Sequence, residues 1–267
     1  MARRLTGAFL ATVALIISTT AAPAKIAPPP PIFVRVAEAD CVVVGKVTSI
    51  DDKTIKIGEV EYRVAVIKLD EGILKAKGLT HVRVAYRPDT GRFKLDLPVG
   101  HEGLYFLSAV KGESFYTTTA YSGVIAKGSG SGSEFDLAVN EAKRAGKVLD
   151  DPVAALKSKE ANERGFAAGM LIIQARSNRF GSAKTEPIDA EISKLILKSL
   201  ADVEDWKGST PFNQFGGPLQ LFLRLGVTEK DGWNQPKDFA EIPAVAAKWL
   251  KENAETYRIQ RFVPDAK

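Results

Sequence analysis

The sequence predicts a segregated α+β protein, in which a small β-barrel is followed by an all-α helical bundle. From Asp40 to about Ala126, apolar residues alternate with polar ones, as they do in half-buried strands. From Phe135 onward, apolar residues recur at helical spacing instead. Turn-forming residues divide the first part into short segments, which is typical of a small barrel or a sandwich. Strands that come first and helices that follow indicate two separate units.

The first twenty-four residues have the pattern of a secretory signal peptide. Arg3 and Arg4 give a basic start, an apolar run covers residues 5–17, and small residues follow it. The apolar run is shorter than the ~20 residues that cross a bilayer, so a cleaved signal is favoured over a retained anchor. We therefore expect cleavage after Ala22 or Ala24 and a mature protein that is periplasmic or secreted.

Four consecutive prolines, Pro28 to Pro31, follow the predicted cleavage region. Consecutive prolines favour the polyproline II conformation, which is stiff and extended. We expect residues 25–38 to form a spacer that holds the folded body away from its surroundings. A recognition motif for a proline-binding module is the alternative interpretation.

The alternating segments predict six or seven strands with turns such as 51–53 and 111–113 between them. Cys41 is predicted to open a buried strand, because a free cysteine usually behaves as a small apolar residue. It is the chain's one cysteine, so no internal disulfide can form. The predicted strands cover residues 42–50, 54–57, 60–66, 82–86, 93–97, 104–109 and 115–120.

Apolar stripes predict five helices in the second part of the chain. The clearest has apolar residues at positions i, i+4, i+7, i+8 and i+12, starting from Ile188. Pro187 is expected near the first turn of that helix, and Pro243 at the start of the last one. The predicted helical segments lie around 135–148, 166–173, 188–200, 219–225 and 245–250. We expect a barrel with its closing helix over 39–150 and an α-helical domain over 151–267.

The segment from Ala39 to Val47, ADCVVVGKV, resembles the opening strand of netrin-like modules, the domain shared with tissue inhibitors of metalloproteinases. In that family an Ala-Asp pair precedes an apolar strand that ends in Gly-Lys-Val or a similar sequence. The resemblance covers about residues 40–150 and implies an OB-like, five-stranded Greek-key barrel with a packed helix. The other similar segments are 62–69, 72–78, 82–84, 103–107 and 135–148.

The sequence departs from this family in its cysteines. Netrin-like inhibitors are rich in disulfides, whereas this chain has one cysteine. Inhibition in that family uses an N-terminal cysteine whose amine and carbonyl chelate zinc, and Cys41 lies inside the expected mature chain. The resemblance therefore implies the fold and not the inhibitory residues.

Linear catalytic motifs are absent from the sequence. It has no Gly-x-Ser-x-Gly elbow and no phosphate-binding loop ending in Gly-Lys-Ser/Thr. His81 is expected on the polar face of a strand, and His101 in a turn. His101 beside Glu102 is a weak candidate for a site, because adjacent residues on an extended chain point to opposite sides. Two histidines without a partner motif do not make a zinc site, so neither a metal nor a cofactor is predicted.

Two tryptophans are the remaining candidates for a binding role. Trp206 and Trp233 are each flanked by polar loop residues, and an exposed indole can anchor a partner. Packing over a loop is the alternative for both. Trp249 belongs to a helical stripe and is expected in the core.

The net charge of +5 comes from Lys and Arg interleaved with Asp and Glu, which argues against a nucleic-acid partner. We expect an exported, non-enzymatic interaction protein whose partner is a protein or a component of the cell envelope. It should have no membrane span after signal removal, and its oligomeric state is left open. One alternative is a hydrolase-type enzyme with a site in the cleft between the two units. Another is an oligosaccharide-binding module on the barrel face.

Overall fold

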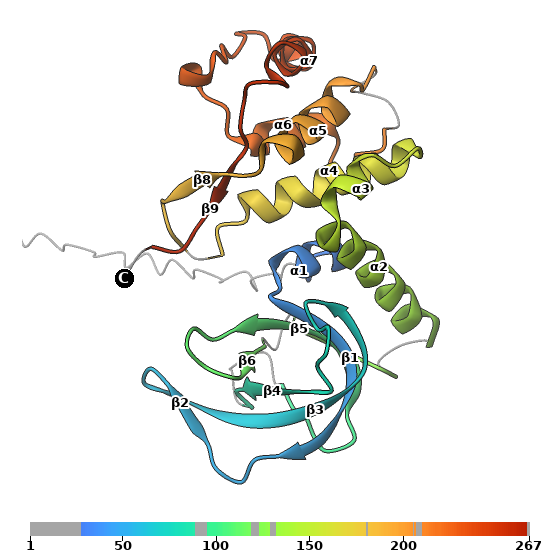
Figure 1. Ribbon diagram of the computed structural model, residues 1–267, viewed down its shortest axis with the longest axis vertical. Coiled ribbons are helices and arrows are strands. Elements are labelled where there is room, and N and C mark those ends of the chain that lie inside the picture. The colour runs from blue at the N-terminus through green and yellow to red at the C-terminus, as the bar shows by residue number, and fades with distance from the viewer. Residues whose placement is uncertain are drawn as a thin grey trace, which may run out of the picture.

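The computed structural model describes residues 28–88, 95–118, 123–128, 132–179, 181–204, 206 and 210–265. The expected signal peptide and its cleavage sites lie outside these residues. Within them the chain is mixed α and β, with a seven-stranded sheet and seven α-helices. The strands of the large sheet lie together on one side of the molecule and most helices on the other (Figure 1).

The strand pairings of the large sheet form a closed ring that starts and ends at β1. The order is β1-β3-β4-β6-β5-β7, β2 pairs with β3, and β1 also pairs with β5. Five strands thus form a closed circuit of pairings, in which β4–β6 is parallel and the other pairs are antiparallel. The strands are β1 (Cys41–Ile50), β2 (Ile55–Ile57), β3 (Val60–Leu74), β4 (His81–Tyr86), β5 (Glu102–Ala109), β6 (Tyr116–Thr117) and β7 (Val124–Ala126).

Both faces of β1 are buried over residues 41–43, and both faces of β5 over residues 104–107, which explains why these stretches are apolar without interruption. Successive side chains on a strand point to opposite faces. Val42 and Val43 are both fully buried but belong to different clusters, one shared with the helices and one enclosed by the strands. On β5, Phe106 belongs to the cluster shared with the helices, and Leu107 belongs to the cluster enclosed by the strands. The sheet therefore has its own core and also contributes to the helical core.

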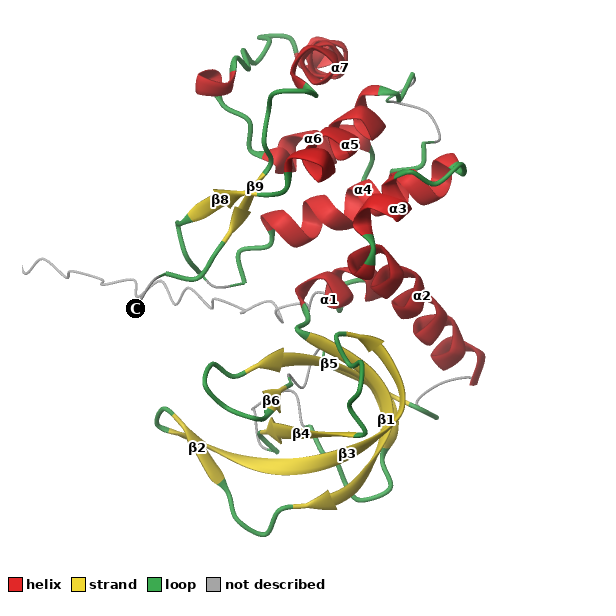
Figure 2. Cartoon of the chain, in the orientation of Figure 1, coloured by secondary structure: helices red, strands yellow, loops and turns green. Residues whose placement is uncertain are grey.

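The helices surround α4, a central helix that is buried along most of its length. Residues Gly165–Ile173 of α4 are all buried. Asp151 and Asp189 cap α3 and α5, because their carboxylates accept hydrogen bonds from the first free backbone N–H groups. A small antiparallel sheet of β8 (Thr185–Pro187) and β9 (Gln260–Phe262) lies among the helices (Figure 2). The helices are α1 (Ile32–Glu38), α2 (Gly132–Asp150), α3 (Pro152–Leu156), α4 (Ala161–Arg176), α5 (Ala190–Ala201), α6 (Pro218–Leu225) and α7 (Ile242–Asn253).

One apolar cluster joins the sheet to the helices. It extends from Val42 and Phe106 in the sheet to Phe166 and Trp249 in the helices. Helix α2 approaches the end of β3 closely at Gly146, where a Cβ atom would lie 2.7 Å from the carbonyl oxygen of Ile73. Only glycine permits this contact without a shift of the backbone. The sheet and the helices are thus packed as one body.

The expected spacer is wrong for residues 32–38, which form helix α1. Phe33, Val36 and Ala37 have i, i+3, i+4 spacing and are buried. Helix α1 itself lies between the sheet and α4 (Figure 1). The Phe33 ring lies 4.9 Å from that of Phe215, centroid to centroid. Pro31 keeps the extended conformation expected of it and precedes the helix at its N-cap.

The structure also differs from the expected positions of Pro187, of the strand over 93–97 and of the boundary between strands and helices. Pro187 lies in β8 and not in the first turn of α5, which begins after Asp189. Leu95 and Leu97 are buried, but 95–98 form no strand, and 89–94 lie outside the described residues. The separation of strands from helices is incomplete, because α1 precedes the sheet and β8 and β9 lie among the helices.

Candidate functional site

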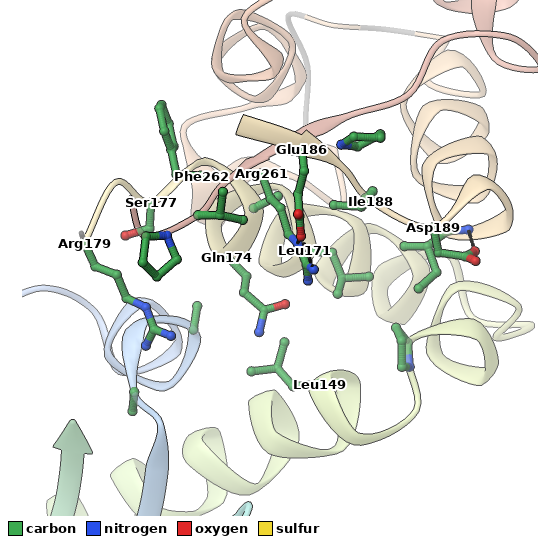
Figure 3. A pocket seen from close by; sticks show the side chains of 18 of the residues that line it. Leu149, Leu171, Gln174, Ser177, Arg179, Glu186, Ile188, Asp189, Arg261 and Phe262 are labelled. Atoms are coloured by element: carbon green, nitrogen blue, oxygen red, sulfur yellow. Dashed lines mark hydrogen bonds and ion pairs between the residues drawn. The ribbon is translucent and has the colours of Figure 1, made fainter. Parts of the chain in front are cut away.

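A cleft of about 720 Å³ opens where the helices meet the α1–β1 junction (Figure 3). Its walls come from the turn after β3, the end of α2, the second half of α4, the β8–β9 sheet and the start of α5. The apolar lining includes Leu149, Leu171, Ile188, Ile192 and Phe262. The polar lining is Lys75, Gln174, Ser177, Arg179, Glu186, Asp189 and Arg261.

Gln174 is the one polar residue in the apolar stretch of α4 that runs from Gly165 to Ala175. The residues on either side of it, Ile173 and Ala175, are buried, whereas Gln174 is exposed. Its amide extends into the middle of the cleft, facing Leu149 (Figure 3). Among the described residues no group hydrogen-bonds to this side chain. The amide therefore offers the cleft both a donor and an acceptor.

Lys75 supplies a cation at the edge of the cleft. It lies in the turn after β3 with a φ of 48°, a left-handed conformation that is uncommon for residues other than glycine. Leu74 and Ala76 on either side are buried, and they hold the turn in place. The ammonium group makes no hydrogen bond or ion pair with any other described residue.

Arg261 and Glu186 form an ion pair that projects into the cleft (Figure 3). They are opposite each other in the β8–β9 register, and Arg261 Nε donates to Glu186 Oε1 at 2.9 Å. Arg261 Nη2 contacts the same oxygen. The charge of the Glu186 carboxylate is therefore already balanced by a neighbour.

Arg179 fixes one wall of the cleft to the α1–β1 junction. Its Nη2 atom lies 2.8 Å from Asp40 Oδ1, and its Nη1 donates to the Glu38 carbonyl oxygen at 2.8 Å. Ser177 Oγ donates to Glu38 Oε1 at 2.8 Å. Asp40 Oδ2 also accepts from the backbone N–H of Ala109, at 2.9 Å. The loop after α4 is thus held by charge-assisted hydrogen bonds.

The second lining carboxylate, Asp189, has a structural role. Its Oδ1 accepts hydrogen bonds from the backbone N–H groups of Glu191 and Ile192, at 2.8 and 3.0 Å. These are the N–H groups that a bound anion at the start of α5 would need. The start of α5 is therefore already occupied by its own cap.

The structure places His101 away from the cleft, beside a buried tyrosine. Its Nδ1 lies 2.7 Å from the hydroxyl of Tyr105, which is fully buried. Burial lowers the pKa of His101 and raises the pKa of Tyr105. His81 is exposed on β4, as expected. Neither histidine lines the cleft.

The two candidate tryptophans lie in the helical core. Trp233 is 7% exposed and packs edge to face on Phe222, with ring centroids 4.7 Å apart. Trp206 is half-buried at 6.3 Å from the same ring. Trp249 packs on Phe222 from another side. The structure brings the tryptophans together around one phenylalanine, and none of them lines the cleft.

The sequence interpretation missed Lys75, Gln174, Arg179 and Arg261. Gln174 had a usable signal, because it interrupts an apolar stretch on a helix. The others come from segments far apart in the sequence, which only the tertiary fold brings to one cleft.

Comparison of the sequence with protein-family models and with curated proteins finds no match. Of the helices that the structure describes, none is both long and apolar enough to cross a bilayer. In the same part of the chain, no three His, Cys, Asp or Glu side chains are grouped so that they could hold a metal ion.

Proposed function

We propose that this is an exported, non-enzymatic binding protein whose cleft takes a small molecule of the cell envelope or the extracellular space. The observation that carries the proposal is the free Gln174 amide, directed into an apolar-walled cleft from the buried stretch of α4. The volume of about 720 Å³ lies within the ~300–1,000 Å³ usual for sites of small ligands. A few placed polar groups in apolar walls are typical of such sites.

The contacts of the two lining carboxylates favour binding over the hydrolase alternative. A general acid or base needs a carboxyl group that is free to exchange a proton with a substrate. Glu186 bonds to Arg261, and Asp189 caps α5. The same cleft is therefore better suited to holding a ligand than to proton transfer.

We further propose that the strand circuit is an OB-like Greek-key barrel of the netrin-like kind, closed by α2. The strand order β5-β1-β3-β4 supports this, because it places the fourth strand of the circuit beside the first. OB folds bind ligands on the face of their second and third strands. In this circuit the second and third strands are β3 and β4. Tyr62 on β3 and Ile55 on β2 are half-buried and pack together beside them, so this face of the sheet is the second candidate site, for an oligosaccharide.

Native mass spectrometry of the protein isolated from the envelope fraction tests the binding role. Gln174→Trp should fill the cleft and remove a co-purifying small molecule. Asn162→Trp, at an exposed position near the start of the same helix, is the matched control and should retain it. A ligand that persists in Gln174→Trp, or the absence of any ligand from the unmodified protein, would refute the proposal.

N-terminal sequencing of the same material tests export. The mature chain should begin at Pro23 or Lys25. An intact Met1 in the envelope fraction would contradict cleavage.

A further inference from the structure

We infer that the cleft binds an amphipathic monocarboxylate, with its carboxylate at Lys75 and its apolar body against the helical walls. The inference rests on the proposed binding function and adds the chemical class of the ligand.

The charges that line the cleft leave one cation without a protein partner in the described part of the chain. Arg261 is paired with Glu186, and Arg179 with Asp40. Lys75 has no such pair. A ligand that carries one negative charge would complete the balance through a charge-assisted hydrogen bond.

The cleft is better matched to a single carboxylate than to a phosphate group. Phosphate sites in proteins usually combine several donors, often the free N–H groups at the start of a helix. The helix that starts at this cleft is α5, and Asp189 already occupies its N–H groups. One lysine and one amide suit a smaller monoanion.

The rest of the cleft favours an apolar body on the ligand. Leu149, Ile188 and Ile192 are half-buried and pack on the main core with one side, and they line the cleft with another. Phe262 and Leu171 continue the same surface. A hydrocarbon group placed there would remove this apolar surface from water.

Gln174 adds a polar group to the apolar part of the cleft and can complement Lys75. Its amide lies among Leu149, Leu171 and the Arg261–Glu186 pair (Figure 3). It can donate to the ligand's carboxylate or to a hydroxyl on its chain. The site thus combines a cation, an amide and an apolar surface.

Calorimetric titration of the full protein with octanoate and with octanamide tests the inference. The two probes share a chain, and only octanoate is charged. Octanoate should bind about tenfold more tightly, and Lys75→Gln should abolish that preference. Lys77→Gln, an exposed position two residues along that does not line the cleft, should leave it unchanged. Raising the salt concentration should weaken octanoate binding and leave octanamide binding unaffected.

The outcomes separate this inference from the function on which it rests. Equal affinities for the two probes, or an octanoate preference that survives Lys75→Gln, would overturn the carboxylate assignment and leave a binding cleft in place. If neither probe binds while the protein carries a different co-purified molecule lost in Gln174→Trp, the carboxylate class is wrong and the cleft is right. If neither probe binds and no molecule co-purifies, both are wrong.

Discussion

His101 and Tyr105 form a polar pair between β1, β5 and the turn before β5. The sequence predicted His101 in a turn. It could not reveal that the Tyr105 hydroxyl reaches the His101 ring, because His101 directly precedes β5 and Tyr105 lies within that strand. The buried hydroxyl needs a partner, since an unpaired polar group in the core is costly. His101 is therefore part of the architecture of the sheet, and its burial favours the neutral form of the ring.

We predict that His101→Asn reduces the loss of stability on acidification from pH 7.5 to pH 5. Burial holds the pKa of folded His101 below 6.5, its ordinary value and the one expected in the unfolded chain. The unfolded state then binds more protons, so this contribution is complete above about pH 6.5 and declines as the pH falls toward the folded pKa. Urea unfolding of both proteins at the two pH values measures the difference. Identical losses in the two proteins would contradict it.

At the scale of elements, the contact between α2 and β3 determines how the helices sit on the sheet. The apolar stripe of α2 was readable from the sequence, because Phe135, Ala138 and Ala142 recur at helical spacing. The role of Gly146 was not readable, since a glycine within a helix gives no sign of what it faces. Helix α1 was missed because the prolines before it dominated the interpretation, although Phe33, Val36 and Ala37 carried a helical pattern.

We predict that Gly146→Ala lowers the free energy of unfolding by about 1–3 kcal/mol, the usual cost of overpacking. The added methyl group would lie 2.7 Å from the Ile73 carbonyl oxygen and 3.1 Å from its Cγ2 atom. Gly132→Ala, in the same helix with nothing within 4 Å, is the control and should not destabilise the protein. Chemical denaturation of the two variants gives the comparison. Equal stabilities would mean that α2 does not approach β3 this closely.

For the whole molecule, the positions of the main strands and helices were predictable, and the way they share a core was not. Alternation and helical spacing are local signals, and they located β1, β5, α2, α5 and α7. The shared core depends on which face of β1 meets the helices, and Val42 and Val43 look alike in the sequence. The cleft is a product of this packing, so its lining residues could not be assembled before the fold was known.

We predict that the sheet and the helices unfold in one transition, because one apolar cluster includes both. The chain carries its own probes, since its one cysteine is enclosed by the strands and its three tryptophans lie in the helical part. Burial raises the pKa of the Cys41 thiol to about 11, so it should react with a thiol reagent only after unfolding. Thiol labelling and tryptophan fluorescence should give the same guanidinium midpoint. Two separate midpoints would show that the sheet and the helices unfold independently.

Hydrogen–deuterium exchange of the full protein with and without octanoate shows whether the cleft is the binding site. We expect slower exchange in 171–179, 186–192 and 261–264, three segments that contribute residues to the lining of the cleft. Protection confined to 51–60 and 110–115, near β2 and the turn after β5, would place the site on the sheet and contradict binding in the cleft.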